Sequence, residues 1–236
     1  MKMTNETSYR VAGVCGLLSI ILFSIEIPLY AARGLMPSNN PASLIGYATR
    51  NAANMLIVVL LDTMICGLLL FFLAGFRRLI RDGQPSSMWL ATQVFGAGVV
   101  YTAFTLYADL LQGVIAFNAL SGDPDPSLIR AFLSSRYPVF GAMTLIFSAV
   151  LLSAASYVAH ASRAFPAITT WIGYCGAVLC LVLVPFAIAG GPNPTTLLDT
   201  VHLDAISKIA IVPVSFWMIA IAIAMFRTES RQPEAH

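Results

Sequence analysis

Three carboxylic acids, Glu26, Asp62 and Asp109, lie inside stretches of sequence that are otherwise apolar enough to cross a membrane. An ionised carboxylate in hydrocarbon costs about 2.5 to 3.5 kcal/mol even on the mildest insertion scale, so such residues usually face the interior of a helix bundle and mark a functional site. A carboxyl group in that setting can donate a proton to a substrate or hold a cation. These three acids are therefore the predicted catalytic residues.

Polar neighbours extend two of the acids into stripes along a predicted helix. At about 100° per residue, Tyr30 shares a face with Glu26, and Thr102 and Thr105 share a face with Asp109. An amide at the edge of the second stripe and two nearby tyrosines complete the set. The residues predicted to contact a substrate are Tyr30, Tyr101, Thr102, Thr105, Tyr107 and Gln112.

The same charged residues also have a structural interpretation. A single acid in a membrane span can hydrogen-bond to a tyrosine, a serine or the backbone of the next helix, and Glu26 could pair with Arg33 or Arg50 near the interface. The spacing of Asp204 and Lys208 is typical of an i, i+4 pair that stabilises the start of a helix.

Metal and cofactor chemistry has little support in the sequence. Asp199, His202 and Asp204 could supply ligands, with Glu26 from another helix, but their spacing matches no familiar metal signature. Phosphate-binding loops, nucleophile elbows and the HExxH motif are absent. We expect neither a metal nor a cofactor.

The small and sulfur-containing residues are typical of helix packing. The spacing of Gly13 and Gly16 indicates a close approach between two membrane helices. The cysteines lie in apolar segments without CxxC spacing, which indicates packing residues, and they are Cys15, Cys66, Cys175 and Cys180.

The composition is that of an integral membrane protein. The chain has 236 residues, of which 58% are hydrophobic and only 10% charged, against about 25% charged residues in an average soluble domain. A net charge of +2 without a basic cluster excludes a nucleic-acid-binding protein. We expect one transmembrane helical domain over residues 1–236, of the all-α class.

Apolar stretches of about 20 residues, enough to cross the hydrocarbon core, occur six times. Turn-rich segments between some of them precede short amphipathic stretches, Ala42 to Thr49 and Leu128 to Ser134, which predict interfacial helices in the outer loops. The predicted spans are Val11 to Ala32, Ala53 to Phe76, Met88 to Gln112, Pro138 to Val158, Ala167 to Ala189 and Ile206 to Phe226, and the third could extend to Asn118.

The distribution of lysine and arginine predicts the orientation. The termini and the second and fourth loops carry eight of these residues and the opposite side carries five, so the positive-inside rule places both termini in the cytoplasm. Trp89 and Trp171 begin spans on the same side, where aromatic belts form. Glu26, Asp62 and Asp109 then all lie in the outer half of the bilayer, which predicts an acidic pocket that faces outward.

The second span and both its flanks carry a family resemblance. The residues concerned are Asn54, Met55 and Leu56, then Asp62, Leu68 to Phe72 and the basic segment Arg77, Arg78, Leu79, Ile80 and Arg81, together with the opening Arg10, Val11, Ala12 and Gly13. With these features the chain resembles an uncharacterised family of bacterial six-span membrane proteins catalogued as a domain of unknown function. The resemblance implies six spans in the bacterial inner (plasma) membrane, and it implies no catalytic residues.

Three functions remain open on this basis. The first is an enzyme on a lipid-like or isoprenoid substrate, with one of the acids as general acid and tyrosine faces beside the developing positive charge. The second is a transporter or ligand-binding protein whose acids hold a cation or an amine. The third is a structural or regulatory subunit whose polar stripes bind a partner helix. The expected partners are accordingly membrane lipids, a small-molecule or isoprenoid ligand, and another membrane protein or a second copy.

Overall fold

The computed structural model describes residues 5–34, 40–135, 141–162, 165–189 and 203–227. Within these residues the chain forms seven α-helices and one short 3-10 helix, which confirms the all-α class. The elements are α1 (Asn5–Ala32), α2 (Pro41–Gly83), η1 (Pro85–Ser87), α3 (Met88–Leu120), α4 (Pro126–Ser135), α5 (Ala142–Ser162), α6 (Ala167–Ala189) and α7 (Leu203–Arg227).

Five of the helices are long and apolar enough to cross a membrane. They contain the segments Thr7–Ala32, Pro41–Gly83, Pro85–Leu120, Ala142–Ser162 and Ala167–Ile188, and a sixth apolar segment, Val212–Arg227 of α7, is shorter in its described part. Large apolar side chains such as Leu60, Phe71 and Phe117 are exposed on the outside of the bundle. Lipid is the solvent that such a surface requires. The chain is a multi-pass helical membrane protein.

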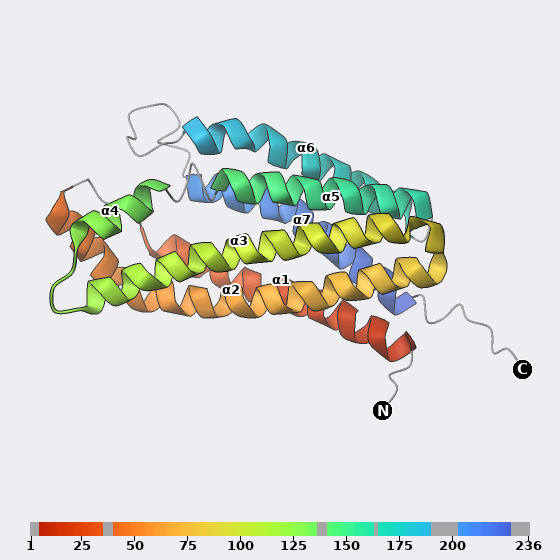
Figure 1. The fold of residues 1–236 in the computed structure, drawn as a ribbon, viewed down its shortest axis with the longest axis horizontal. Helices are drawn as coiled ribbons and strands as arrows, with labels where there is room; N and C mark the ends of the chain where they lie inside the picture. The colour runs from red at the N-terminus through yellow and green to blue at the C-terminus, as the bar shows by residue number, and fades with distance from the viewer. Residues whose placement is uncertain (1–4, 35–39, 136–140, 163–164, 190–202, 228–236) are drawn as a thin grey trace, which may run out of the picture.

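The long helices form a ring that follows chain order (Figure 1). Helix α1 packs against α2 and α7, and the remaining neighbours run from α2 through α3, α5 and α6 to α7. The start of α1, η1 and the end of α7 lie at one end of the bundle, on the right of Figure 1, which we call the terminal end. Helix α4 lies at the opposite end, which we call the α4 end, and packs against α2 and α3.

The structure corrects the prediction for the second span. Instead of an interfacial helix followed by a separate span from Ala53, α2 is one helix of 43 residues. Asn40 caps its start by accepting a hydrogen bond from the Ala42 N–H at 2.9 Å, and no proline interrupts the helix after Pro41. At 1.5 Å per residue α2 is about 65 Å long, roughly twice the hydrocarbon thickness. Helix α2 therefore extends beyond the membrane core.

The other predicted elements agree more closely with the structure. Helix α6 has the predicted bounds, and α3 extends two residues beyond the longer alternative. The short amphipathic helix predicted from Leu128 is present as α4. The segment from Gly190 to Pro194 lies outside the described residues.

Two separate apolar cores pack the bundle. The larger one joins α1, α2, α3, α5, α6 and α7 toward the terminal end, where Trp217 makes edge-to-face contacts with Phe72 and with Phe76. The smaller one joins α2, α3 and α4 and is centred on Met55 and Ile115. Along α2 and α3 these cores leave a gap between them, and Asp62 and Asp109 lie in that gap.

Close packing of α1 depends on small residues, as predicted. A Cβ atom at Gly16 would lie 2.6 Å from the Phe72 ring, and one at Gly13 would lie 3.0 Å from the Phe226 ring. Membrane helices associate mainly through such van der Waals contacts, because lipid supplies no hydrophobic driving force between them. Helix α1 is thereby held against α2 and α7.

Candidate functional site

One cavity of about 230 Å³ lies between the two apolar cores, and all three intramembrane acids line it. Glu26 comes from α1, Asp62 from α2 and Asp109 from α3. Each helix presents its acid inward because the rest of that helix face is packed against its neighbours. The convergence expected from the sequence is therefore present in the fold.

The residues predicted to contact a substrate divide into two groups. Four of them line the cavity beside the acids, namely Tyr30, Tyr101, Thr105 and Gln112. The other two do not. Thr102 is buried on the same face of α3 and donates its hydroxyl to the Gly98 carbonyl at 2.8 Å. Tyr107 is 54% exposed on the outside of the bundle, because two residues at about 100° each place it almost opposite Asp109.

Glu26 is the most enclosed of the three acids. Its side chain is 2% exposed, and its carboxyl group lies within hydrogen-bonding reach of Asp62 and Tyr30 and within Coulomb range of Asp109. One of its oxygens, Oε2, is buried without a hydrogen-bond partner among the described residues. Leaving a buried acceptor unsatisfied costs about 1 to 3 kcal/mol. Glu26 thus has an acceptor available for a ligand.

The cavity carries an excess of acidic groups. Among the described residues, its lining includes Glu26, Asp62 and Asp109 but no lysine, arginine or histidine. The remaining polar lining groups are neutral, such as Thr144, Ser148 and Ser215. A group that brings positive charge or hydrogen-bond donors would complement this lining.

A buried arginine organises the α4 end of the cavity. Helix α1 ends just before Gly34, whose φ of 73° is the left-handed conformation common after helices. The Arg33 side chain donates to Asn54 Oδ1 at 2.7 Å and to Gln112 Oε1 at 2.9 Å. It therefore joins α1 to both α2 and α3.

Further hydrogen bonds hold the partners of Arg33 in place. Asn54 donates to the Leu29 carbonyl at 2.8 Å, and Gln112 donates to the Met55 carbonyl at 3.2 Å. The Arg33 guanidinium also lies 4.3 Å from the centre of the Tyr30 ring, in range for a cation–π interaction. Two cavity-lining side chains, Tyr30 and Gln112, are thus positioned by Arg33. The sequence suggested Glu26 as a partner for Arg33 and did not identify this network, because hydrogen bonds to amides leave no periodic signal.

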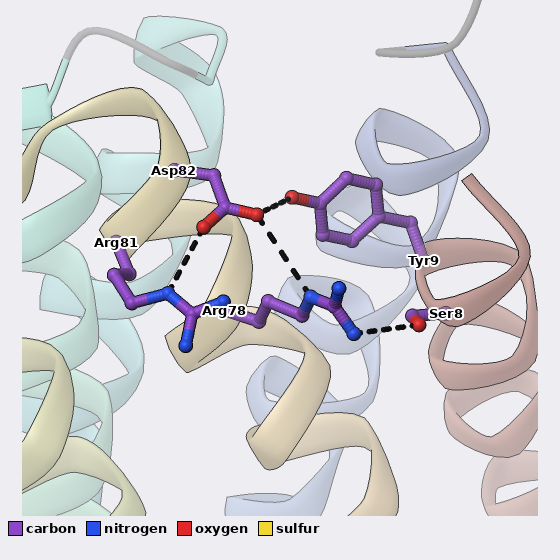
Figure 2. A network of polar contacts seen from close by, with 5 residues as sticks. All are labelled: Ser8, Tyr9, Arg78, Arg81 and Asp82. Carbon is purple, nitrogen blue, oxygen red and sulfur yellow. Dashed lines mark hydrogen bonds and ion pairs between the residues drawn. The ribbon is translucent and has the colours of Figure 1, made fainter. Parts of the chain in front are cut away.

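A second polar network lies at the terminal end (Figure 2). The Tyr9 hydroxyl donates to Asp82 Oδ2 at 2.7 Å, and Arg81 donates to Asp82 Oδ1 at 3.0 Å. Arg78 lies 3.8 Å from Asp82 Oδ2 and donates to the Ser8 hydroxyl at 2.8 Å. These contacts tie the start of α1 to the end of α2.

Several cavity residues were not predicted as site residues. Phe132 comes from α4, Ser148 from α5 and Trp217 from α7, and Cys66 lines the cavity from α2. Apolar and weakly polar residues of this kind are common throughout a membrane span. Only knowledge of the helix order could have selected them.

Some predicted features lie outside what the structure describes. Asp199 and His202 are outside the described residues, and so are the side chains of Asp204 and Lys208. Within the described part of the chain, no group of three or more His, Cys, Asp or Glu side chains is arranged to hold a metal ion.

Comparisons with protein-family models, with curated proteins and with solved structures return no match to this chain.

Proposed function

We propose that this chain is a six-span protein of the bacterial inner membrane that binds a small cation or amine in the acidic cavity, with both termini in the cytoplasm. Among the functions that the sequence left open, this one makes the most direct use of three acids around one cavity. The ligand would supply the positive charge that the lining residues lack.

The proposed topology is supported by length and by charge. All 25 residues of α7 form one helix, which is long enough to span about 30 Å of hydrocarbon. The basic residues are more numerous on the side of the termini. Trp89 and Trp171, at the terminal-end starts of α3 and α6, are 64% and 66% exposed, as expected for an aromatic belt at the interface. The α4 end would then face outward.

The observation that carries the proposal is the state of Glu26. A carboxyl group in a largely apolar cavity, with a buried oxygen that lacks a partner among the described residues, is costly unless a ligand completes it. Asp62 lies within hydrogen-bonding reach of the same group. A cationic ligand would allow both neighbouring carboxyl groups to ionise and would pair with the Glu26 oxygen at the same time.

Acid catalysis is the second candidate, and one observation favours it. The enclosed carboxyl of Glu26 lies near the rings of Tyr30 and Tyr101, which could stabilise a carbocation. The cavity volume limits the substrate, however. At about 230 Å³ it lies below the roughly 300 to 1,000 Å³ typical for drug-sized ligands. A long isoprenoid chain would not be enclosed, so binding of a small ligand is the better-supported function.

Native mass spectrometry of the gently purified protein would test the proposal. We expect a small basic molecule to be bound, and we expect its occupancy to fall sharply in Glu26→Gln, Asp62→Asn and Asp109→Asn. Asp123→Asn is the matched control, because Asp123 is an exposed acid in the loop before α4. Loss of the ligand in the control as well, or a bound molecule that is unaffected by all three cavity variants, would refute the proposal.

A titration with ethylamine would separate the two candidate functions further. An amine that binds reversibly and is recovered unchanged supports the binding protein. Failure of every added amine to bind, combined with turnover of a small alkene, would instead support acid catalysis. Unfolding of all three cavity variants without any bound mass would make the acids structural and would favour the partner-subunit alternative.

A further inference from the structure

The cavity is acidic toward the α4 end and uncharged toward the terminal end. On its α4 side the lining includes Glu26, Asp62 and Asp109. On its terminal side apolar side chains lie beside hydroxyl groups, and the lining there includes Leu69, Leu151, Met218, Ser19, Ser148 and Ser215. The acids of α2 and α3 lie on the α4 side of the larger apolar core. A ligand that fits the whole cavity therefore has its charge at one end and a mainly apolar remainder.

The cavity is also long. Its lining on α1 runs from Ser19 to Tyr30, which corresponds to about 16 Å along the helix. A ligand that reaches both ends of this lining must be elongated. An extended chain meets this requirement better than a fused ring system does.

Trp217 lies on the terminal side of the cavity. Its ring is fully buried and meets Phe72 and Phe76 at centroid distances of 6.1 and 5.7 Å. Gly16 of α1 packs against Phe72, so Trp217 lies near the level of Gly16, about 15 Å from Glu26 along α1. The Trp217 Nε1–H is buried without a hydrogen-bond partner among the described residues. We expect this side chain to limit the length of chain that the cavity accepts.

From these observations we infer that the ligand is an unbranched amphiphilic amine, with its ammonium group among Glu26, Asp62 and Asp109 and its extended chain directed toward Trp217. This inference rests on the proposed function and specifies its ligand class. The ammonium donates to Glu26 Oε2, the acceptor that lacks a partner among the described residues. The chain packs against the apolar side chains that line the terminal side of the cavity.

Calorimetric titration of the detergent-purified full chain with n-alkylammonium chlorides, from ethylamine to tetradecylamine, tests the inference. Each added methylene should raise the affinity about fourfold, the equivalent of about 0.8 kcal/mol per buried CH₂, until the chain reaches Trp217. Longer chains should then bind more weakly. The n-alcohols of matching length are the control for partition into detergent, and they should show no such optimum.

The variant Trp217→Phe provides a sharper test. Phenylalanine keeps the aromatic packing but is smaller, so the optimum should move to longer chains. Trp171→Phe, a substitution at an exposed position on α6, should leave the optimum unchanged. A structural role for Trp217 alone would change stability without shifting the optimum.

The outcomes separate this inference from the proposed function. An affinity for amines that does not depend on chain length, or that is higher for cyclohexylamine than for hexylamine, would overturn the inference and leave the proposed function standing. Absence of binding for every amine, including ethylamine, would overturn both. An optimum that Trp217→Phe does not move would show that the chain does not point toward Trp217.

Discussion

The two tyrosine–carboxyl clusters between α1 and α2 differ in what surrounds them. At the terminal end, Tyr9 donates to Asp82, and Arg78 and Arg81 lie beside the same carboxylate. In the cavity, Tyr30 lies within hydrogen-bonding reach of Glu26, but the neighbouring groups are two more acids, Asp62 and Asp109. The first cluster pairs its acid with basic side chains, whereas no basic side chain among the described residues lines the cavity that holds the second.

The comparison shows that a tyrosine and a carboxylic acid can serve two purposes in the same protein. An acid paired with arginines near the bundle surface holds two helices together and contributes modestly to stability. An acid enclosed among other acids lowers stability unless a ligand binds. Natural proteins keep such costly arrangements mainly at functional sites.

Replacing Arg33 with alanine should destabilise the protein by about 3 kcal/mol. The change leaves the side-chain oxygens of Asn54 and Gln112 without their donors, and each unsatisfied oxygen costs about 1 to 3 kcal/mol. This loss of stability is larger than the ~0.6 kcal/mol of an average interhelical hydrogen bond in a membrane. Thermal unfolding in detergent measures it. Arg50→Ala, at an exposed position on α2, is the control and should change stability little. If both variants lose the same unfolding stability, the Arg33 hydrogen bonds do not hold the helices together.

The substitution Glu26→Gln should weaken amine binding by roughly 10- to 100-fold, since a hydrogen bond to a charged group contributes about 1.5 to 3 kcal/mol. Unfolding stability should remain the same or rise, because the variant removes a carboxyl that has acidic neighbours. Paired measurements of affinity and of thermal unfolding would establish both halves of this prediction. If this variant unfolds easily yet binds amines normally, Glu26 has a structural role like that of Asp82.

Changes to the terminal cluster should have the reverse pattern. Asp82→Asn or Tyr9→Phe should lower stability by no more than about 1 kcal/mol, and added salt should reduce the effect of Asp82→Asn because the Arg pairs are partly exposed. Amine affinity should not change, since the cluster lies outside the cavity lining. A loss of affinity in either variant would show that the two clusters are coupled.

The smallest expected effect concerns Asp125 at the start of α4. Hydrogen bonds from the Ser127 hydroxyl and N–H to this carboxylate lower its pKa below the ordinary value. Because the pKa of Asp125 is lower in the folded state than in the unfolded state, its hydrogen bonds stabilise the start of α4 at pH values above its ordinary pKa of about 3.9. This stabilisation is lost as the pH falls through the lower pKa of the folded state. Hydrogen exchange at Ser127 and its neighbours, compared between pH 5 and pH 3, should therefore show α4 fraying only under acid conditions. Asp123 lies in the same loop and has no hydrogen bond to α4 among the described residues. Asp123→Asn is therefore the control and should leave the exchange unchanged.

Much of the membrane architecture could be predicted from the sequence, because apolar length and helical periodicity are local properties. The acids on α1, α2 and α3 converge as expected, since polar residues in spans turn away from lipid. The continuity of α2 was not predicted. A turn-rich loop before Ala42 and the amphipathic stretch after it resemble an interfacial helix, but no residue after Pro41 stops the helix.

The rest of the cavity depends on information that no local pattern contains. Trp217 and Ser148 became lining residues only through the order of the helices around the bundle. Tyr107 was included because it is close to Asp109 in sequence, although its periodicity places it on the opposite face. The sequence offers Arg33 or Arg50 as a partner for Glu26, yet the described partners of Arg33 include the amides of Asn54 and Gln112, which sequence spacing cannot reveal.

The central claim is that the acids form one cation-binding group, and a double-mutant cycle between Glu26 and Asp62 tests it most directly. Trp89→Phe and Trp171→Phe leave Trp217 as the only tryptophan of the three in the chain, so its fluorescence can report hexylamine binding inside the cavity. In this background, affinities are compared for the parent, Glu26→Gln, Asp62→Asn and the double variant. A shared site predicts a coupling energy of at least about 1 kcal/mol, outside the ~0.3 to 0.5 kcal/mol within which independent sites add. Additive effects, or no effect of either change on hexylamine affinity, would contradict the account.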